Sequence, residues 1–590
     1  MGRPVAVAIA VLWMVICFST RAIEAGVPPA DVILYNGRIH TMNDRQRQAA
    51  MIAVVGDRIV HVGGAGDVDR WRGDATQLID LEGRTVIPGL IESHGHLLAL
   101  GRSRMILDLS GAHNFDDLVR RVASAVEATP SGQWILGAGW HQSKWDPPPD
   151  PAVNGFPVHR VLSQVSPSHP VFLTHASGHA GLANAMAIAL AGITPHTVVD
   201  GDGEIIREPD GTPTGVFTER AQELIRRAIP EATPERNRQA LSLAISEALE
   251  NGITSFRDAG SSREDIDRYR SFLSEGRLGV RVWVMVDGSD SDLVEEWLER
   301  GPEIDSGNRF LTIRAFKLFA DGALGSRGAW LLSPYADRPE HSGHSLIAME
   351  DLYRLSAAAL RRGFQLCVHA IGDRANREVL NQFERAFTSY PANSQDHRFR
   401  IEHAQHIDPS DIPRFARMGV IASVQGIHFS SDRPWAIDRL GRDRISDGAY
   451  PWQSLLASGA VVVNGTDAPV EPINPIASFY ASVTRKTLDG RPQNGFEPYQ
   501  RMSRHQALKA YTLDAAFAGF EDSVKGSIEV GKLADFTVLS RDIMTIAEDR
   551  ILGTRVEMTI IGGRVAYSRA ERRGASVAPT PSTSRVTRYP

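Results

Sequence analysis

Eight apolar runs of strand-like length recur through the middle of this chain, and stretches with helical patterning separate them. In order, the runs are TVIPGLIESHGH, GITSFRDA, VRVWVMV, IRAFKLFADG, FQLCVHAIGD, FRIEHAQH, GVIASVQ and VVVNGTDAPV. Apolar runs that alternate with helices are typical of a parallel β-sheet wrapped by helices. Eight such units predict an α/β fold, a (β/α)8 TIM-like barrel whose chemistry lies at the C-terminal ends of the strands.

The rest of the chain departs from this alternation. Residues 26–84 and 521–570 contain short alternating strands with Asn-Gly and Gly-Asp turns, so we expect the two chain ends to pair into one small β-sandwich. Residues 98–233 fall between the first and second runs and predict an insertion over the barrel mouth. The barrel then comprises a first strand in residues 85–97 and a remainder in residues 234–520.

Residues 1–25 have the pattern of a secretory signal peptide. A positive charge precedes an apolar stretch from Val5 to Phe18, and small residues lie before Gly26. The alternative is an uncleaved membrane anchor, but the stretch is shorter than the ~20 residues that span a bilayer. We expect an exported protein, periplasmic or secreted, with no stable membrane partner after signal removal. Residues 571–590, rich in Ser, Thr, Pro and Arg, predict a disordered tail.

Composition excludes several classes of protein. At 590 residues and 42% hydrophobic content the chain can bury a large core, so disorder or a fibre is not expected. Its 64 Lys+Arg and 70 Asp+Glu leave a net charge of −6 without a basic stripe, so nucleic acid is not an expected partner. The expected partner is a small-molecule substrate, and the sequence is compatible with a homo-oligomer.

Ionisable side chains gather at the ends of the predicted strands. Singly, each has an ordinary explanation, because most histidines are hydrogen-bonded structural residues and an aspartate after a strand often caps a helix. Together they are more informative, since the chain has only 19 histidines and four of them lie at such ends. The group is His94, His96, Lys317, His369, His403 and Asp467.

A divalent metal explains why these residue types occur there. Residues i and i+2 of a strand point the same way, so His94 and His96 can both present nitrogen to one ion. Neutral imidazole and carboxylate suit Zn²⁺. Such an ion lowers the pKa of bound water from 15.7 to about 7 and polarises a substrate carbonyl. Asp467 is then placed to take the proton from that water and deliver it to the leaving nitrogen.

An ordered set of motifs resembles the metal-dependent amidohydrolase superfamily, in its amidohydrolase-3 (YtcJ-like) branch, which includes N-substituted formamide deformylases. The motifs are VIPGLIESHGH, AFKLFADGALGSRGAWL, CVHAIGDRAN, RIEHAQH, NGTDAPVEPINP and GKLADFTVL. They span nearly all of the chain after residue 25. The resemblance implies a hydrolase of carbon–nitrogen bonds other than peptide bonds, such as those of N-substituted amides or formamides.

The same resemblance implies roles for single residues. Asp467 matches the acid/base aspartate, and Lys317 matches a lysine that related enzymes carboxylate, as N6-carboxylysine, to bridge two metals. A lysine must be neutral to take up CO2, and burial near cations lowers its pKa in that direction. The alternative is an unmodified Lys317 paired with Asp321, so the number of Zn²⁺ or similar ions stays open between one and two. The matched metal ligands are His94, His96, His369 and His403.

Departures from the family pattern affect the expected substrate. Glu92 stands where many relatives have aspartate, and we expect it to support the ligands without binding the metal. His179 matches a family histidine of the insertion, and we expect it to contact substrate. Ser177 and Leu182 replace the acid and the aromatic residue often found beside it.

Loops after the strands face the same mouth and supply three more candidates for substrate binding. These are Asp321, Gln425 and His428.

Two alternatives to the amidohydrolase interpretation stay open. The same site is compatible with hydrolysis of a lactone, phosphoester or amidine, because fold and metal ligands are shared across chemistries. A non-catalytic exported binding or regulatory protein on the barrel scaffold is the other. The complete set of ligands argues against it, since binding alone gives no reason to place Asp467 among four histidines.

Overall fold

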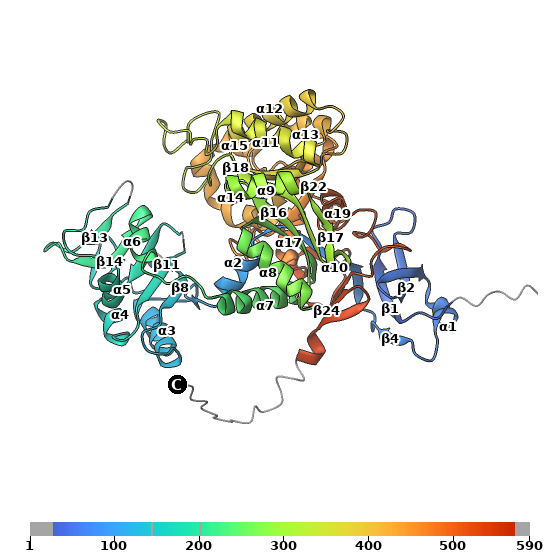
Figure 1. The fold of residues 1–590 in the computed structure, drawn as a ribbon, viewed down its shortest axis with the longest axis horizontal. Coiled ribbons are helices and arrows are strands. Elements are labelled where there is room, and N and C mark those ends of the chain that lie inside the picture. Colours follow the sequence, from blue (N-terminus) through green and yellow to red (C-terminus); the bar gives the residue numbers. More distant parts are fainter. Residues whose placement is uncertain (1–27, 143–144, 177, 200–202, 573–590) are drawn as a thin grey trace, which may run out of the picture.

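The computed structural model describes residues 28–142, 145–176, 178–199 and 203–572 (Figure 1). The predicted signal peptide lies outside these residues, and so does the predicted tail from residue 573 onward. Within the described ranges, the structure contains no helix with the length and apolar character needed to cross a bilayer.

Eight parallel strands form the central sheet, which follows the order β6, β15, β16, β18, β19, β20, β21 and β22. Each strand coincides with one of the eight apolar runs, so the predicted α/β barrel is confirmed. Helices cover its outer surface (Figure 1). The strands span Leu90–Gly95, Ile253–Ser261, Arg281–Asp287, Leu311–Phe319, Gln365–Ala370, Arg400–His403, Ile421–Gln425 and Val462–Gly465.

A carboxylate closes the seam between the first and last barrel strands. Glu92 on β6 is fully buried and accepts hydrogen bonds from the backbone N–H and the hydroxyl of Thr466, at 2.8 and 2.9 Å. It also accepts one from the N–H of His94 at 3.2 Å. Burial raises the pKa of the Glu92 carboxyl to about 8. Just beyond the strands, the N–H of Asp467 donates to the carbonyl of His94 at 2.8 Å. Glu92 therefore supports the strand ends, as expected.

The two ends of the chain build one further sheet of eight strands, which confirms that they pair. The junction is antiparallel, with Val86 of β5 opposite Val538 of β23. A buried ion pair, Arg281 to Asp535 at 2.8 Å, connects this sheet to the barrel. The strands are β1 Val32–His40, β2 Gln48–Val55, β3 Arg58–Gly63, β4 Gln77–Asp80, β5 Thr85–Pro88, β23 Phe536–Leu539, β24 Val556–Ile561 and β25 Arg564–Ser568.

The insertion after β6 has its own six-stranded sheet and its own hydrophobic core, and it lies to one side of the barrel (Figure 1). Two of its residues, His141 and His179, nevertheless line the cavity at the barrel mouth. In sheet order its strands are β13 Ile205–Arg207, β14 Pro213–Thr218, β12 Ala180–Ala183, β11 Val171–His175, β8 Ile135–Trp140 and β7 Leu107–Asp108.

Helix α7, Pro234–Glu250, shows why the barrel helices begin and pack as they do. Thr233 caps it by accepting from the N–H of Arg236, and proline occupies the first turn. Its buried face contacts α2, Leu97–Ser103, where a Cβ on Gly101 would lie 1.8 Å from the Ala240 carbonyl. Leu243 lies away from this buried face and is 37% exposed.

The other main barrel helices follow the strands in order. They are α8 Arg263–Ser274, α9 Ser291–Arg300, α11 Met349–Arg362, α12 Asp373–Ser389, α13 Ile412–Met418, α14 Gly426–Leu440 and α17 Pro475–Thr484.

Candidate metal centre

All six predicted site residues lie at one rim of the barrel and line one cavity of about 860 Å³. Five different strands contribute, because parallel strands bring their C-terminal ends to the same edge. His94 lies on β6, Lys317 on β18, His369 on β19 and His403 on β20. His96 directly follows β6 and Asp467 follows β22.

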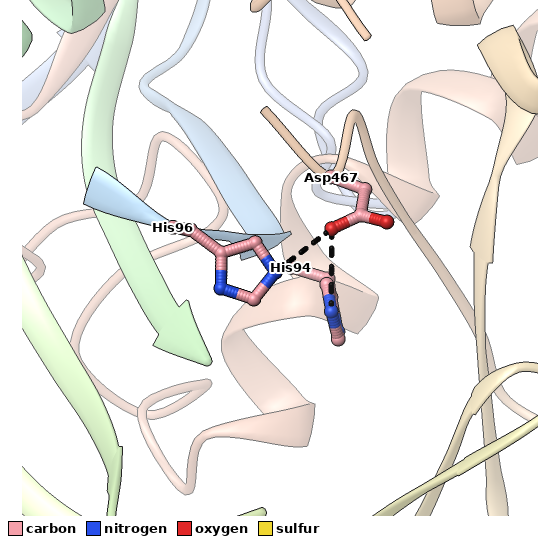
Figure 2. Close-up of side chains that lie close together, drawn as sticks. All are labelled: His94, His96 and Asp467. Atoms are coloured by element: carbon pink, nitrogen blue, oxygen red, sulfur yellow. Dashed lines mark ion pairs between the residues drawn. The ribbon is translucent and has the colours of Figure 1, made fainter. Parts of the chain in front are cut away.

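The first cluster joins His94, His96 and Asp467. The Nε2 atom of His96 lies 3.1 Å from Oδ1 of Asp467, and Nε2 of His94 lies 3.6 Å from the same oxygen. Both imidazoles point toward this carboxylate (Figure 2). One potential ligand atom from each residue lies within 4.8 Å of the others, which is compact enough for a single ion.

A second cluster shares the same aspartate. Nε2 of His428 lies 3.7 Å from the other carboxylate oxygen, Oδ2 of Asp467. The rings of His428 and His403 are stacked, with centroids 6.0 Å apart, and the three residues again place ligand atoms within 4.8 Å. Asp467 therefore faces histidines on both of its oxygens. His428, which the sequence assigned to substrate binding, lies beside the expected ligands.

Lys317 and His369 complete the wall of the cavity. The amine of Lys317 is buried and has no hydrogen-bond partner among the described residues, although it lies 3.6 Å from the ring centroid of Phe319. The His369 ring lies 4.4 Å from that of His403. Asp321 does not pair with Lys317 within the described chain, because its carboxylate accepts from the N–H groups of Trp330, Ile371 and Gly372.

Buried partners orient two of the imidazoles. Nδ1 of His94 lies 2.6 Å from Oε2 of Glu402, and Arg400 donates to the same oxygen at 2.9 Å. Burial opposes the charge of Glu402, but Arg400 and His94 hold the pKa of its carboxyl well below its usual range. Nδ1 of His403 lies 2.8 Å from Oε1 of Gln425. Such partners fix which ring nitrogen faces a metal.

Two residues of the site adopt a backbone conformation that is rare for residues other than glycine. His403 has φ of 73° and Asp467 has φ of 59°, both in the left-handed region. Such conformations cost about 1–3 kcal/mol each and persist where the surrounding structure enforces them. They turn the chain at His403, the last residue of β20, and at Asp467, two residues after β22 ends.

The electrostatics of the cavity favour the protonation states that metal ligands need. Burial, reinforced by Lys317, lowers the pKa of His369 to about 3. Burial and the neighbouring histidines hold the pKa of His403 well below its usual value. Burial also lowers the pKa of Lys317 to about 8. For Asp467 burial acts in the opposite direction, but the hydrogen bond from His96 and nearby imidazoles keep its pKa well below the usual value.

The donors at the rim fit a divalent metal. Several buried polar atoms of cavity-lining residues lack a hydrogen-bond partner among the described residues, including Nζ of Lys317, Nε2 of His369 and Nε2 of His428. Buried polar groups are normally satisfied, so orphans that converge on one space point to an absent ligand. Imidazole nitrogens together with a carboxylate are the ligand types that zinc takes.

The structure separates the four residues predicted to bind substrate. His179 and His428 line the cavity, and Nδ1 of His179 lies 3.1 Å from Oε2 of Glu219. Asp321 and Gln425 do not line it, because both are buried behind the predicted ligands and hydrogen-bonded there. For these two, the structure replaces the predicted substrate contact with a supporting position.

Sequence reasoning missed several residues of the site. Glu402 was detectable, because it stands two residues after Arg400 on β20, so the two opposite charges share one face of the strand. The outer cavity wall gave no comparable signal, since its residues lie on helices and loops, apart from Phe319 at the end of β18. They include His141, Phe319, Asp432, Trp435, Arg439 and Glu471.

Comparisons with known proteins agree with this geometry. The sequence profile described as the Amidohydrolase family matches residues 77–567. Across 91% of its length, the chain is 31% identical to the putative amidohydrolase YtcJ of Bacillus subtilis and covers 99% of that protein. Across the same share of its length, it is 28% identical to the N-substituted formamide deformylase of Arthrobacter pascens and covers 98% of that protein.

One solved structure matches with a TM-score of 0.72 and 27% identity, covering 88% of this chain and 99% of the other. It is an uncharacterised metal-dependent hydrolase from Pyrococcus horikoshii.

Proposed function

The chain belongs to the amidohydrolase family, and from that premise we propose that it is a metal-dependent hydrolase of carbon–nitrogen bonds other than peptide bonds, acting on an N-substituted amide or formamide. The similarity to an N-substituted formamide deformylase supports this substrate class. The observation that carries the proposal is the Asp467 carboxylate, which faces His94 and His96 on one oxygen and His428 on the other.

The residues that would hold one or two zinc ions are His94, His96, Lys317, His369, His403 and Asp467. A bound ion would supply a Lewis acid and lower the pKa of a water molecule to about 7. We assign to Asp467 the movement of the proton. Its depressed pKa keeps it a carboxylate at neutral pH, so Oδ2 can take a proton from the attacking water and then give it to the leaving nitrogen.

Lys317 is proposed to carry a carboxyl group on its amine. With a pKa of about 8, a substantial fraction of the amine is neutral near pH 7.5. The neutral nitrogen attacks CO2, forms a C–N bond and loses a proton, which gives a carbamate with two ligand oxygens. Native mass spectrometry of the intact protein tests this, and the expected result is the mass of one carboxyl group that disappears in Lys317→Ala.

Export is a separate proposal, which rests on the sequence pattern of residues 1–25. The test is N-terminal sequencing of protein recovered from the periplasm or medium. A chain that begins near Gly26 is expected, and a chain that retains Met1 in the cytoplasm contradicts export.

A substrate screen tests the reaction class. Purified protein is offered N-formyl amines, N-acyl amino acids, lactones and phosphotriesters, with Asp467→Asn as the control. We expect turnover of formamides or other amides and its loss in the variant. Turnover of lactones or phosphotriesters alone would overturn the substrate class, and undiminished turnover by the variant would remove Asp467 from the mechanism.

A further inference from the structure

Residues 107–228 of the insertion pack as a separate unit. The unit comprises the six-stranded sheet and helices that include α3, Phe115–Ala128. Its two clusters of buried apolar side chains draw only on residues 109–225. No hydrogen bond or ion pair between described residues joins residues 107–228 to the barrel or to the terminal sheet. Domains of one chain that share so small an interface normally move relative to each other.

The first connection between the barrel and the insertion contains one residue that belongs to neither core. Met105 packs against the barrel core and Leu107 against the insertion core, which leaves Ile106 between them. Arg104 is ion-paired with Glu247 of α7 at 2.6 Å, so the chain is attached to the barrel up to the residue before Met105. A bend in this connection therefore falls at Ile106.

The second connection returns from the insertion to α7. Ile229 packs against the insertion core and Thr233 caps α7, so the exposed residues 230–232 lie between the two units. The backbone N–H groups of Glu231 and Ala232 donate to no described residue. Hinges are typically a few loop or element-terminal residues that absorb a change in backbone angles. Both connections line the same cavity, so the two bends lie close together.

Open space separates the insertion from α7 beside these connections. Two adjoining cavities, of about 370 and 610 Å³, are lined by Gln133 and Trp134 of the insertion and by Arg236 of α7. A packed protein interior has few voids larger than a water molecule. The insertion can therefore rotate about the two connections without displacing tightly packed side chains.

The cavity at the metal centre has walls from both units. His141, directly after β8, and His179, directly before β12, line it from the insertion, and the predicted ligands line it from the barrel. Because β8 and β12 belong to one sheet, a rotation of the insertion moves both histidines together relative to the barrel rim.

We propose that the insertion is a hinged lid, which bends at Ile106 and at residues 230–232, closes over the metal centre and brings His141 and His179 against the bound substrate. The role of the two histidines rests on the proposed function, whereas the hinge does not. Closure would exclude bulk water from the reacting bond, and opening would release product. Because turnover needs both movements, fixing the lid in any one position should slow it.

Distance measurements on the free protein test the hinge itself. Spin labels on cysteines that replace Ser124 of α3 and Ser274 of α8 span the two units, and labels that replace Ser274 and Ser389 of α12 lie within the barrel. Cys367 is buried, and Cys17 is replaced by serine. Double electron–electron resonance should give a broader distance distribution for the first pair than for the second. Two equally narrow distributions would overturn the hinge.

A tether tests whether the motion serves turnover. Gln133→Cys and Gln239→Cys place thiols on exposed residues of the insertion and of α7 that line one cavity, and a short bismaleimide joins them. We expect kcat/KM for N-pentylformamide to fall by about tenfold or more, because small misplacements of groups at the reacting bond have effects of that size. A long, flexible bismaleimide on the same thiols is the matched control and should leave kcat/KM near that of the untethered variant. Equal activity with the two tethers would overturn the lid.

Single substitutions test the histidines that the lid carries. His141→Ala and His179→Ala should each lower kcat/KM for N-pentylformamide. His196→Ala is the control, because His196 is an exposed histidine of the insertion that does not line the cavity, and it should keep the wild-type value. Wild-type kinetics in the first two variants would remove the histidines from the proposal.

The outcomes separate this inference from the proposed function. A broad distance distribution across the hinge in a protein that hydrolyses no amide supports the hinge and removes the proposed function. Narrow distributions, together with formamide turnover that does not depend on tether length, overturn the hinge and leave the proposed function intact.

Discussion

The two ends of the barrel treat buried polar groups in opposite ways. At the end that meets the terminal β-sheet, Arg281 and Asp535 are 3% and 5% exposed and are joined by two hydrogen bonds at 2.8 and 3.0 Å. At the rim, buried atoms of Lys317, His369 and His428 lack such partners among the described residues. Buried polar groups without partners are costly, so we infer that the groups at the rim are positioned to bind a ligand, whereas those at the other end stabilise the fold.

Strand β20 shows the same contrast over a few residues. His397, shortly before the strand, is connected on both ring nitrogens, with Nε2 2.9 Å from the Met418 carbonyl and Nδ1 accepting from the N–H of Phe399. His403, at the other end, is fixed through Nδ1 to Gln425 and lies in the cavity. The same residue type is therefore structural at one end and available for binding at the other.

The largest expected effect is at the rim. Asp467→Asn removes the proposed proton carrier and a shared ligand, so kcat/KM should fall by about 10⁴-fold, or ~5.5 kcal/mol. The free energy of unfolding of metal-free protein should fall little, because Asp467 does not form an ion pair with an arginine like that of Asp535 with Arg281. Steady-state kinetics and urea unfolding measure the two effects. A kcat/KM within tenfold of wild type would contradict the role proposed for Asp467.

At the end of the barrel that meets the terminal β-sheet, a substitution is expected to reduce stability and leave activity unchanged. Arg281→Met leaves the Asp535 carboxylate buried without its partner, which should lower the free energy of unfolding by about 3–5 kcal/mol. The double variant with Asp535→Asn should recover part of this loss. Urea unfolding gives the stabilities, and kinetics at low denaturant should show unchanged kcat. A variant as stable as wild type would mean that this pair does not secure the terminal sheet to the barrel.

Glu402 combines the two roles, because it is paired with Arg400 inside the barrel and also orients the predicted ligand His94. Glu402→Gln should weaken metal binding by about 10- to 100-fold through loss of the carboxylate that orients His94. Chelator competition measures the affinity. Circular dichroism should be recorded in parallel, since Arg400 loses its counter-charge. Unaltered affinity in a folded variant would show that the ring is oriented by other contacts.

The smallest effect is the pH dependence contributed by His397. Burial lowers its pKa to about 4 in the folded protein, against about 6.5 when unfolded. Between these values the unfolded chain binds more protons, so stability decreases as pH falls. From pH 6.5 to 5.5 the loss from this residue is about 1 kcal/mol. Urea unfolding at both values, in wild type and His397→Gln, should show a weaker pH dependence in the variant; equal dependence would contradict the assignment.

Strand positions were predictable from sequence because each barrel strand is a buried apolar run, and the gathering of the candidate ligands at the strand ends followed from the topology of a parallel barrel. The packing of loops and side chains beyond the strands was not predictable from the sequence. Asp321 turns inward because the N–H of Trp330 and the N–H groups of Ile371 and Gly372, on the loop after β19, converge on it. Gln425 turns toward His403. Local patterns specify which element forms, but not which loop approaches it.

The most direct test of the account is the metal content of protein purified without chelators. The prediction is one or two equivalents of zinc or a similar divalent ion per chain, lost in the double variant His94→Ala and His96→Ala while far-ultraviolet circular dichroism stays that of a folded protein. Wild-type protein that holds no stoichiometric metal, even after incubation with Zn²⁺, would contradict the central claim that these side chains form a metal centre.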